Sequence, residues 1–512
     1  MTKEQIHRLK IKLCKTFHLK DIPSNSDIIA HIPTSYSDIE KEKLIRLLQR
    51  KPMRTISGVA IIAIMTSPEI CPHGTCLPCP GGPEYESPQS YTGFEPAAMR
   101  AKMNEFDPYL QVKARLNQIE IIGHPTDKID LIIMGGTFTG RTPWYQEWFV
   151  KRCFDAMNKV DSLSLDDAKK LNETADHRCI GLTIETRPDW FRLHQVDNSL
   201  FYGATRVELG VQTVFDDVLH IMQRGHTVSD TISATRIAKN VGLKICYHMM
   251  PGLPGSDKKR DIDAFKTIFS DPNFKPDMLK IYPTLVIEGT PLYDMWKNKE
   301  YEPLSTRESQ MLIADVMSFV PEWVRIQRIQ RDVPAQYINS GVLKSNLRQL
   351  VDDELNSQGI GTHEIRSREI GHQKNQKIEE FENLDVRIHS VEYEASDSSE
   401  VFISLITKHK YLVGYLRLRE ILSSHRRELH DKSCMMIREL RVVGKEVGIG
   451  KQKSDGLQHK GFGSQLLKEA EKISKEKFNQ KYLYVLSGVG VKQYYRSYHN
   501  FKDQCIYLYK KL

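Results

Sequence analysis

Six short apolar segments alternate with longer stretches of helical periodicity through the first part of the chain. They cover residues 58–65, 129–134, 179–185, 205–210, 243–249 and 278–283. Short buried strands that alternate with helices are typical of a parallel sheet with helices packed on it. We therefore expect an α/β fold with an incomplete parallel βα barrel, in which ligands bind at the carboxyl ends of the strands.

Residues 396–512 form a second predicted unit with a different pattern. Two paired strands (401–408 and 411–418) and a strand at 435–443 are followed by a glycine loop, a helix, a strand at 482–487, a second helix and a last strand. A chain of 512 residues exceeds what one hydrophobic core usually serves. We predict a basic arm over 1–55, the barrel domain over 56–330, a linker region over 331–395 and a mixed α/β domain over 396–512.

The net charge of +8 is concentrated near the N-terminus. Residues 1–54 hold twelve Lys or Arg and six Asp or Glu, an excess of six positive charges. Such an arm can bind a polyanion such as RNA, or it can be the solvated face of an amphipathic helix. No segment has the ~18 uninterrupted apolar residues that span a bilayer, and the first residues lack the apolar core of a signal peptide. We expect a cytoplasmic protein without a membrane partner.

Three of the nine cysteines, Cys71, Cys76 and Cys79, stand together in the segment CPHGTCLPCPGG. Their C-x4-C-x2-C spacing lies on a loop rich in Gly and Pro, after the first predicted strand. Three thiolates on one loop can hold three irons of a 4Fe-4S cluster and leave the fourth iron open to S-adenosylmethionine. The alternative is a zinc site completed by His73, although no second set of closely spaced zinc ligands is visible.

A glycine-rich loop precedes a helix in the C-terminal unit. It reads QHKGFG over 458–463, and Leu466, Leu467, Ala470 and Ile473 form one apolar face of the helix that follows. Free backbone N–H groups at such a helix start can cradle a pyrophosphate, and the edge of the preceding strand could bind pantetheine amides. The motif is not specific by itself, because any loop before a helix can contain glycines.

Many segments resemble those of one family. They are RTISGVAIIAIM, CPHGTCLPCPGGPEYESPQSYTGFEPAAMRA, IIMGGTF, GLTIETRPDW, RVELGVQT, RGHT, HMMPGLPG, LKIYPTLVIEGTPLY, RIQRD, QHKGFG and SGVGVKQYYR. From about residue 54 onward the chain resembles the family of the catalytic subunit of Elongator, in its archaeal or bacterial type. The resemblance implies a radical S-adenosylmethionine domain of the incomplete-barrel type, followed by an acetyltransferase domain of the GNAT type.

The resemblance also implies the residues of the site. Cys71, Cys76 and Cys79 would bind the cluster. Gly135 and Gly136 would expose backbone to the amino group of S-adenosylmethionine. Without the resemblance, a Gly-Gly pair after a strand indicates only a tight turn. The implied contacts of acetyl-CoA are Lys128, Glu439, Leu440, Arg441, Val442, Phe462, Gly463, Ser464 and Tyr495. Lys128 would act from the radical domain, and Tyr495 would protonate the departing thiolate. Without the resemblance, Lys128 is an ordinary loop lysine and Tyr495 a core tyrosine.

The implied activity is acetyl-CoA-dependent modification of carbon 5 of the wobble uridine in the tRNA anticodon, which leads to 5-carboxymethyluridine. A radical derived from S-adenosylmethionine would abstract hydrogen from the acetyl methyl, the carbon radical would add to the ring, and hydrolysis of the thioester would follow. His459 and Glu439 are candidate bases for that hydrolysis. The alternatives are a protein lysine acetyltransferase with a structural iron-sulfur domain, and a tRNA-binding scaffold regulated by acetyl-CoA.

The expected partners are the tRNA anticodon stem-loop, acetyl-CoA, and either a second copy of the chain or accessory subunits like those of Elongator. Basic side chains would hold the phosphates, which carry affinity without reading sequence. The candidates are Lys10, Lys12 and Lys15 in the arm, with Arg328, Arg331, Lys344 and Arg348.

Overall fold

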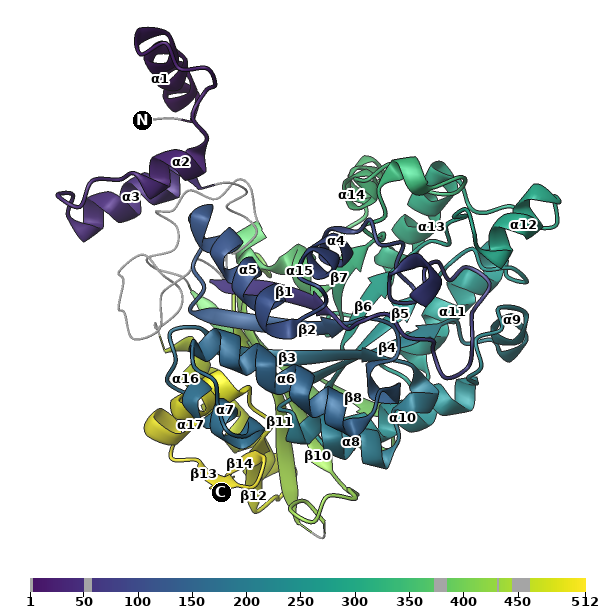
Figure 1. Ribbon diagram of the computed structural model, residues 1–512. Helices are drawn as coiled ribbons and strands as arrows, with labels where there is room; N and C mark the ends of the chain where they lie inside the picture. The colour runs from purple at the N-terminus through teal and green to yellow at the C-terminus, as the bar shows by residue number, and fades with distance from the viewer. Residues whose placement is uncertain (1–2, 50–57, 373–384, 431, 444–460) are drawn as a thin grey trace.

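The computed structural model describes residues 3–49, 58–372, 385–430, 432–443 and 461–512. Within these residues the chain folds into two seven-stranded sheets, and three N-terminal helices project from one side (Figure 1). The first sheet is parallel and the second is mixed. The predicted α/β class, with a parallel βα unit followed by a mixed unit, is confirmed.

The first sheet follows the chain order from β1 to β7, and all neighbouring strands are parallel. β1 and β7 are the two edges of the sheet, which makes it a half-barrel. Six strands match the predicted segments; β7 is absent from the prediction because Arg325 and Arg328 interrupt its apolar residues. The bounds are β1 (Val59–Met65), β2 (Lys128–Met134), β3 (Arg178–Thr186), β4 (Arg206–Gln212), β5 (Lys244–Met249), β6 (Met278–Ile281) and β7 (Arg325–Ile329).

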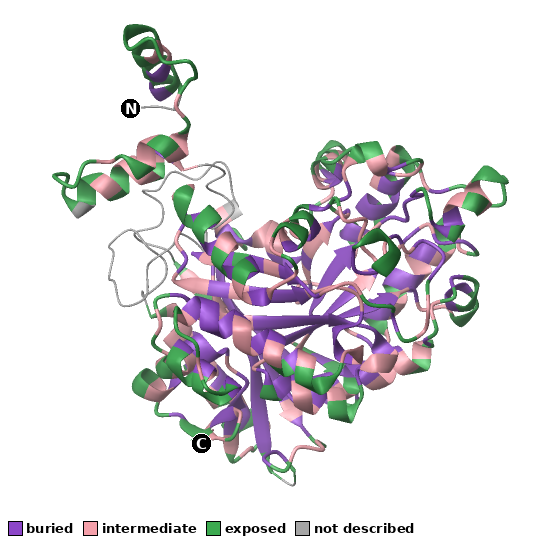
Figure 2. Cartoon of the chain, in the orientation of Figure 1, coloured by how far each residue is buried: buried purple, intermediate pink, exposed green. Residues whose placement is uncertain are grey.

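Helices cover the outer face of this sheet. In β1, residues 60, 62 and 64 are buried in the core under the helices, and 59, 61 and 63 point to the inner face, as the alternation of a strand requires. Figure 2 shows the strands as a buried layer beneath helices whose outer faces are exposed. The helices are α4 (Pro96–Met103), α5 (Pro108–Ile121), α6 (Pro143–Asn158), α7 (Leu165–Asn172), α8 (Leu193–Phe201), α9 (Asp216–Ile221), α10 (Val228–Asn240), α11 (Lys258–Ser270), α12 (Pro291–Lys297), α13 (Thr306–Ser318) and α14 (Leu347–Ser357).

The second sheet has the order β13-β14-β12-β11-β10-β9-β8. Its predicted strands are present, but β8 pairs with β9 over ten residues although it falls inside the predicted linker. Its alternating polar residues hide it from a search for apolar runs. The predicted linker, 331–395, is therefore too wide at its C-terminal end. The bounds are β8 (Val386–Ala395), β9 (Ser398–Thr407), β10 (Leu412–Ile421), β11 (Cys434–Val442), β12 (Tyr482–Val485), β13 (Lys502–Gln504), β14 (Tyr507–Lys511), α15 (Ile365–Arg368), α16 (Phe462–Lys472) and α17 (Lys492–His499).

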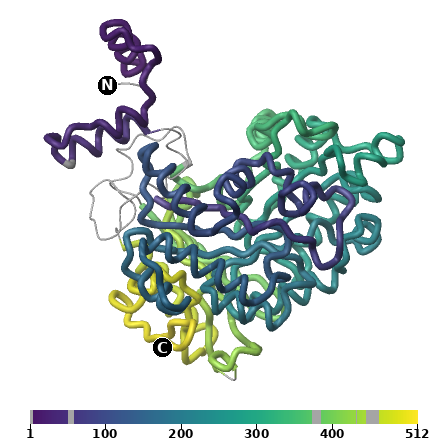
Figure 3. Tube along the Cα trace, viewed as in Figure 1, coloured from purple at the N-terminus to yellow at the C-terminus, as the bar shows by residue number. Residues whose placement is uncertain are grey.

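One hydrophobic cluster crosses the interface between the two domains, and the second domain also has a core of its own. Met436 of β11, Tyr484 of β12 and Tyr507 of β14 belong to the same buried cluster as the strands of the half-barrel. The Tyr507 hydroxyl donates a hydrogen bond to the Val241 carbonyl at 3.0 Å. Figure 3 shows the C-terminal part of the chain lying directly against the first sheet and its helices. The domains are therefore packed as one body rather than joined by a flexible connection.

Buried charges also cross this interface. Asp277, directly before β6, accepts hydrogen bonds from Arg438 of β11, and Arg438 donates at 3.0 Å to Glu400 of β9. Lys239 of α10 donates to the same Glu400 at 2.9 Å. All four side chains are fully buried or nearly so. Because a buried charge is tolerated only when it is paired, this network fixes one arrangement of the two domains.

The N-terminal arm consists of α1 (Lys3–Thr16), α2 (Asn25–Ala30) and α3 (Asp38–Leu48). The Asn25 side chain donates to the Leu48 carbonyl at 2.6 Å, and the Gln49 side chain is hydrogen-bonded to His124 after α5. These contacts connect the second and third helices of the arm to each other and to the half-barrel. Among the described residues, no helix has the length and apolar character needed to cross a membrane.

Candidate active site

The inner face of the half-barrel and the second domain enclose a cavity of about 1370 Å³. Inward-pointing residues line it along the whole sheet, for example 59, 61, 63 and 65 in β1 and 128, 130, 132 and 134 in β2. At a rise of about 3.3 Å per residue, Lys128 and Met134 lie roughly 20 Å apart along β2. The cysteine loop is at the carboxyl end of this passage, and the second domain contributes to the wall of the same cavity.

The loop between β1 and α4 brings the three predicted cluster ligands together. Cys71, Cys76 and Cys79 are free cysteines, and their thiols lie within electrostatic range of one another. Burial raises the pKa of Cys71, and burial together with the neighbouring thiols raises the pKa of Cys79 to about 11. These thiols therefore need a compensating positive charge, such as a bound metal centre, to become thiolates.

Hydrogen-bonding groups surround the three sulfur atoms. They are the Thr137 hydroxyl at Cys71 (3.5 Å), the Ser90 N–H at Cys79 (3.1 Å), and Arg224 and the His73 imidazole at Cys76 (3.5 and 3.0 Å). Donors of this kind stabilise the thiolate form that binds metal.

The glycine pair after β2 is required by the packing around the loop. Gly135 has φ +121°, and a Cβ atom there would lie 2.3 Å from the Thr66 hydroxyl. Gly136 has φ +78°, and its Cβ would lie 3.4 Å from the Cys71 sulfur. Gly136 lines the cavity beside Cys71. Only residues without a side chain fit both positions without strain.

The residues predicted to contact acetyl-CoA come from both domains, and most of them meet at the cavity. Lys128 begins β2 and lines it. The second domain contributes Glu439, Leu440, Arg441, Val442, Gly463, Ser464 and Tyr495. Phe462 instead packs against the core of the second domain. Residues 458–460 of the predicted loop, including His459, lie outside the described residues.

A second pair of glycines allows the C-terminal domain to approach the half-barrel. A Cβ atom at Gly488 would lie 2.1 Å from the Ile180 carbonyl oxygen, and one at Gly490 would lie 2.5 Å from the Arg178 Cβ. The backbone before α17 is therefore in direct contact with β3. This close approach brings α17 and its tyrosines to the cavity.

Tyr494 and Tyr495 of α17 both line the cavity. The Tyr495 ring is buried and lies edge-on to Tyr494 and Phe501, with centroids 5.3 and 5.6 Å away. Burial raises the pKa of Tyr495 far above its ordinary value, and burial also raises that of Tyr494, which is hydrogen-bonded to Ser464. Both phenols therefore stay protonated at neutral pH, as a proton donor must.

Glu439 is unsuited to the role of a hydrolysis base. It accepts hydrogen bonds from Arg417 at 2.8 Å and from the Tyr415 hydroxyl at 3.2 Å. Burial acts to raise the pKa of Glu439, but its cationic neighbours, Arg417 first, lower it below the ordinary glutamate value. A carboxylate held in this way is a weak proton acceptor.

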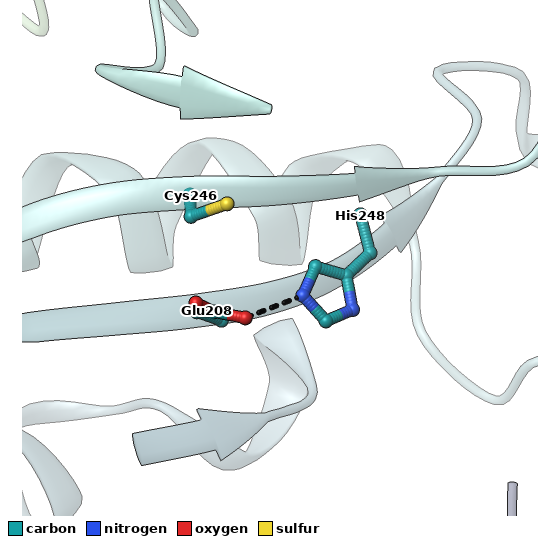
Figure 4. A group of neighbouring side chains, drawn as sticks. All are labelled: Glu208, Cys246 and His248. Atoms are coloured by element: carbon teal, nitrogen blue, oxygen red, sulfur yellow. Dashed lines mark hydrogen bonds and ion pairs between the residues drawn. The ribbon is translucent and has the colours of Figure 1, made fainter. Parts of the chain in front are cut away.

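Buried charges inside the half-barrel form a group that the sequence does not reveal. Glu208 of β4 accepts a hydrogen bond from His248 of β5 at 2.8 Å (Figure 4). It also forms an ion pair with Lys280 of β6. Lys280 also reaches Glu185 at 3.3 Å, and the Tyr91 hydroxyl donates to Glu185 at 2.8 Å. Burial opposes the charge on Lys280, yet its neighbours, Glu208 first, raise its pKa well above the ordinary value.

Cys246 lies beside Glu208 and His248, close enough for the three side chains to share a metal ion (Figure 4). The Lys280 ammonium already supplies the positive charge at Glu208. Burial also raises the pKa of Cys246 well above the ordinary value. The arrangement is that of an ion-pair network rather than a metal site. The sequence feature that could have revealed this network is the presence of a charged or polar residue within each of several apolar strands.

Two of the predicted phosphate contacts already have partners within the chain. The Lys10 ammonium is used within the arm, where it donates to the Pro23 carbonyl at 2.8 Å and to the Asn25 side chain. Arg348 is paired with Asp352 and Glu364. Of the other candidates, Lys12, Lys15 and Lys344 are exposed, and Arg328 and Arg331 line the cavity.

Comparisons with known proteins decide the family. The model of the Radical SAM superfamily matches residues 65–267, that of the Radical_SAM C-terminal domain matches 276–357, and that of the ELP3 N-terminal domain matches 1–56. A protein of Methanocaldococcus jannaschii named tRNA uridine(34) acetyltransferase is 51% identical over 97% of this chain and 92% of its own length. Elongator complex protein 3 of Schizosaccharomyces pombe is 40% identical over 96% of this chain and 91% of its own. The chain belongs to the Elongator complex protein 3 family.

A solved structure of the same family has the same fold. It is the archaeal Methanocaldococcus infernus Elp3 with an N-terminal deletion (1–46), which is 45% identical and superposes with a TM-score of 0.78 over 90% of this chain and all of that one. The predicted resemblance to the Elongator family is confirmed, and the chain is a radical SAM enzyme. Membership of the Radical SAM superfamily implies a 4Fe-4S cluster and S-adenosylmethionine.

The residues at the carboxyl end of the half-barrel fit these two groups. The three thiols converge there with donors aimed at their sulfur atoms. Several buried polar atoms nearby have no hydrogen-bond partner among the described residues, namely Arg187 Nη1, Arg224 Nε and Gln212 Oε1. Such atoms are costly unless a bound polar group completes them.

Proposed function

We propose that this enzyme uses acetyl-CoA and S-adenosylmethionine to attach a carboxymethyl group to carbon 5 of the wobble uridine in the tRNA anticodon. The observation that carries the proposal is the single cavity lined by Cys71 and Gly136 at one end and by Lys128, Glu439 and Tyr495 elsewhere. A carbon–carbon bond to an unactivated uracil carbon requires the acetyl methyl and the radical source to meet in one enclosed space. The names of the relatives support tRNA uridine 34 as the substrate.

The proposed roles follow from position. Cys71, Cys76 and Cys79 hold the cluster, and the backbone of Gly136, beside Cys71, contacts S-adenosylmethionine. When bound, the two groups supply a 5′-deoxyadenosyl radical that abstracts hydrogen. Lys128 contacts the acyl donor from the half-barrel.

The second domain is proposed to be an acetyltransferase domain of the GNAT type. β11 pairs with the parallel β12 only over Cys434–Ile437, and residues 439–442 continue beyond this pairing along the cavity wall. On the β12 side their backbone groups are therefore free, among the described residues, to pair with the amides of a pantetheine arm. The start of α16, at Gly463 and Ser464, is where the pyrophosphate is expected. Tyr495 is the proposed donor to the departing thiolate.

A protein lysine acetyltransferase is the weaker candidate. The acetyl-CoA residues of the second domain open onto the interior of the half-barrel, and the buried Arg438–Asp277 pair holds the two domains together. A lysine side chain on a folded protein would have to reach into this cavity, whereas a flipped-out nucleotide is a compact substrate for it. A cytoplasmic location, and a second copy or accessory subunits as partners, stay predictions.

The test is nucleoside analysis of tRNA after anaerobic reaction with the reconstituted enzyme, acetyl-CoA, S-adenosylmethionine and a reductant. We expect 5-carboxymethyluridine, or its thioester, at position 34 with wild type and its loss in Lys128→Ala. Lys113→Ala removes an exposed lysine of α5 and is the matched control. Acetylation of a basic peptide without any change in the tRNA would refute the proposal.

A further inference from the structure

The cavity contains a carboxylate–histidine pair that has no part in the function proposed so far. His248 is at the carboxyl end of β5, lines the same cavity as Cys71 and Gly136, and keeps 15% of its side chain exposed. Its Nε2 is 2.8 Å from a carboxylate oxygen of the fully buried Glu208 (Figure 4).

The environment of Glu208 decides the tautomer of the imidazole. Burial acts to raise the pKa of Glu208, but Lys280, His248 and Arg206 lower it far below the ordinary value. An ionised carboxylate only accepts hydrogen bonds, so His248 Nε2 carries the proton. In the neutral ring, Nδ1 then has a free lone pair, and it has no hydrogen-bond partner among the described residues.

A chain of contacts connects this pair to the cysteine loop. The Ser90 N–H donates to the Cys79 sulfur, and the next residue, Tyr91, donates to Glu185 at 2.8 Å. Lys280 bridges Glu185 and Glu208. His248 is therefore held on the side of the cavity where the radical is formed.

Resting on the proposed function, we infer that His248 Nδ1 is the base that takes the proton from carbon 5 of the target uracil. The acetyl methyl group first loses one hydrogen atom, which becomes a methyl hydrogen of 5′-deoxyadenosine. The radical on the former methyl carbon then bonds to carbon 5. The unpaired electron is then at carbon 6. To restore the double bond, the C5–H bond breaks and the hydrogen leaves as a proton; the one-electron acceptor that this step needs would be the oxidised 4Fe-4S cluster held by Cys71, Cys76 and Cys79. Glu208 is the positioning residue that stabilises the resulting imidazolium.

Neighbouring groups are poorly suited to this step. Lys280 keeps its proton, because its pKa lies well above the ordinary value. Burial raises the pKa of Tyr282, whose ring lies edge-on to His248 with centroids 5.5 Å apart. Glu185 and Glu208 are already engaged by Lys280. Among the described neighbours of this group, His248 lines the cavity and has an unused lone pair, on Nδ1.

The experiment follows tritium release from tRNA labelled at carbon 5 of its uridines, together with the yield of 5′-deoxyadenosine, under anaerobic conditions with the reconstituted holoenzyme. His248→Asn is compared with Glu208→Gln and with the control His194→Asn, which changes an exposed histidine of α8. We expect His248→Asn to form 5′-deoxyadenosine as wild type does but to release tritium about 100-fold more slowly, the usual contribution of a general base. Glu208→Gln is expected to slow release to a smaller extent.

A second readout separates proton removal from a structural role. With tRNA deuterated at carbon 5, His248→Asn should show a larger isotope effect on product formation than wild type, because C5–H cleavage becomes limiting. Tritium release from His248→Asn at the wild-type rate would overturn the inference. Loss of 5′-deoxyadenosine together with tritium release would also overturn it, because His248 would then be needed to assemble the site. Wild-type enzyme that releases no tritium would instead refute the proposed function.

Discussion

Replacing Arg438 by methionine should destabilise both domains at once. The Arg438 guanidinium is fully buried between the two sheets, where it donates to both carboxylate oxygens of Asp277, to Glu400 at 3.0 Å and to the Leu243 carbonyl at 2.8 Å. Methionine fills much of the same volume but makes none of these bonds. Two carboxylates are then left in the core with one cation fewer.

The magnitude follows from the cost of breaking a buried ion pair from one side, which is about 3–5 kcal/mol. Arg417 remains 3.6 Å from Asp277, and Lys239 and Arg419 remain 2.9 and 3.0 Å from Glu400. Because these cations still neutralise the two carboxylates in part, we expect Arg438→Met to lose stability at the lower end of that range. The half-exposed pair of Arg46 and Glu42 on α3 gives the contrast, since such pairs contribute less than about 1 kcal/mol.

Urea unfolding, followed by both tryptophan fluorescence and circular dichroism, measures the effect. Because one hydrophobic cluster and buried ion pairs cross the domain interface, we expect the half-barrel and the second domain of wild type to unfold in one transition. Arg438→Met should lower its midpoint strongly, and Arg46→Met should leave it nearly unchanged. A loss below about 1 kcal/mol in Arg438→Met, or two well-separated transitions in wild type, would refute the reasoning.

Three further outcomes are expected. Gly135→Ala should bind less iron per chain after anaerobic reconstitution, because its Cβ would meet Thr66 at 2.3 Å; Gly359→Ala, where the added Cβ meets no atom within 4 Å, should load normally. Burial alone would raise the pKa of Glu400, but its cationic neighbours lower it to about 2 from 4.5. The stability it contributes should be present above pH 4.5 and lost as the pH falls towards 2, and urea titrations of wild type and Glu400→Gln between pH 6 and 3 would show it. Tyr495→Phe should slow tRNA-dependent release of free CoA about 100-fold, as a thiol assay can follow, and unchanged release would exclude Tyr495 as the proton donor.

The elements of the half-barrel could be predicted from the sequence where their strands are continuous apolar runs. β7 and β8 could not, because Arg325 in β7 and the alternating polar residues of β8 break the apolar pattern. Arg325 of β7 and Arg438 of β11 are paired with residues far away in the chain, Arg325 with Glu369 and Arg438 with Asp277. A local pattern contains no information about such partners.

The residues of the candidate site also fall into two groups, those that could be predicted from the sequence and those that could not. The cysteine triplet, the glycine pair and the loop before α16 have fixed local spacings, so the sequence and the family resemblance were sufficient to propose them. Glu208, His248 and Lys280 come from three different strands and meet only when the half-barrel forms. The contact of Lys10 with Asn25 could not be foreseen for a similar reason, since the two residues are fifteen positions apart in the chain.

The claim that the acyl donor and the radical share one cavity is tested most directly with acetyl-CoA whose methyl group carries three deuterium atoms. After anaerobic reaction with tRNA and S-adenosylmethionine, the 5′-deoxyadenosine is isolated and its mass is measured. We predict that it contains one deuterium atom, transferred from the acetyl methyl, and that the label depends on tRNA and disappears in Lys128→Ala. Unlabelled 5′-deoxyadenosine, formed while the tRNA is still modified, would contradict the account.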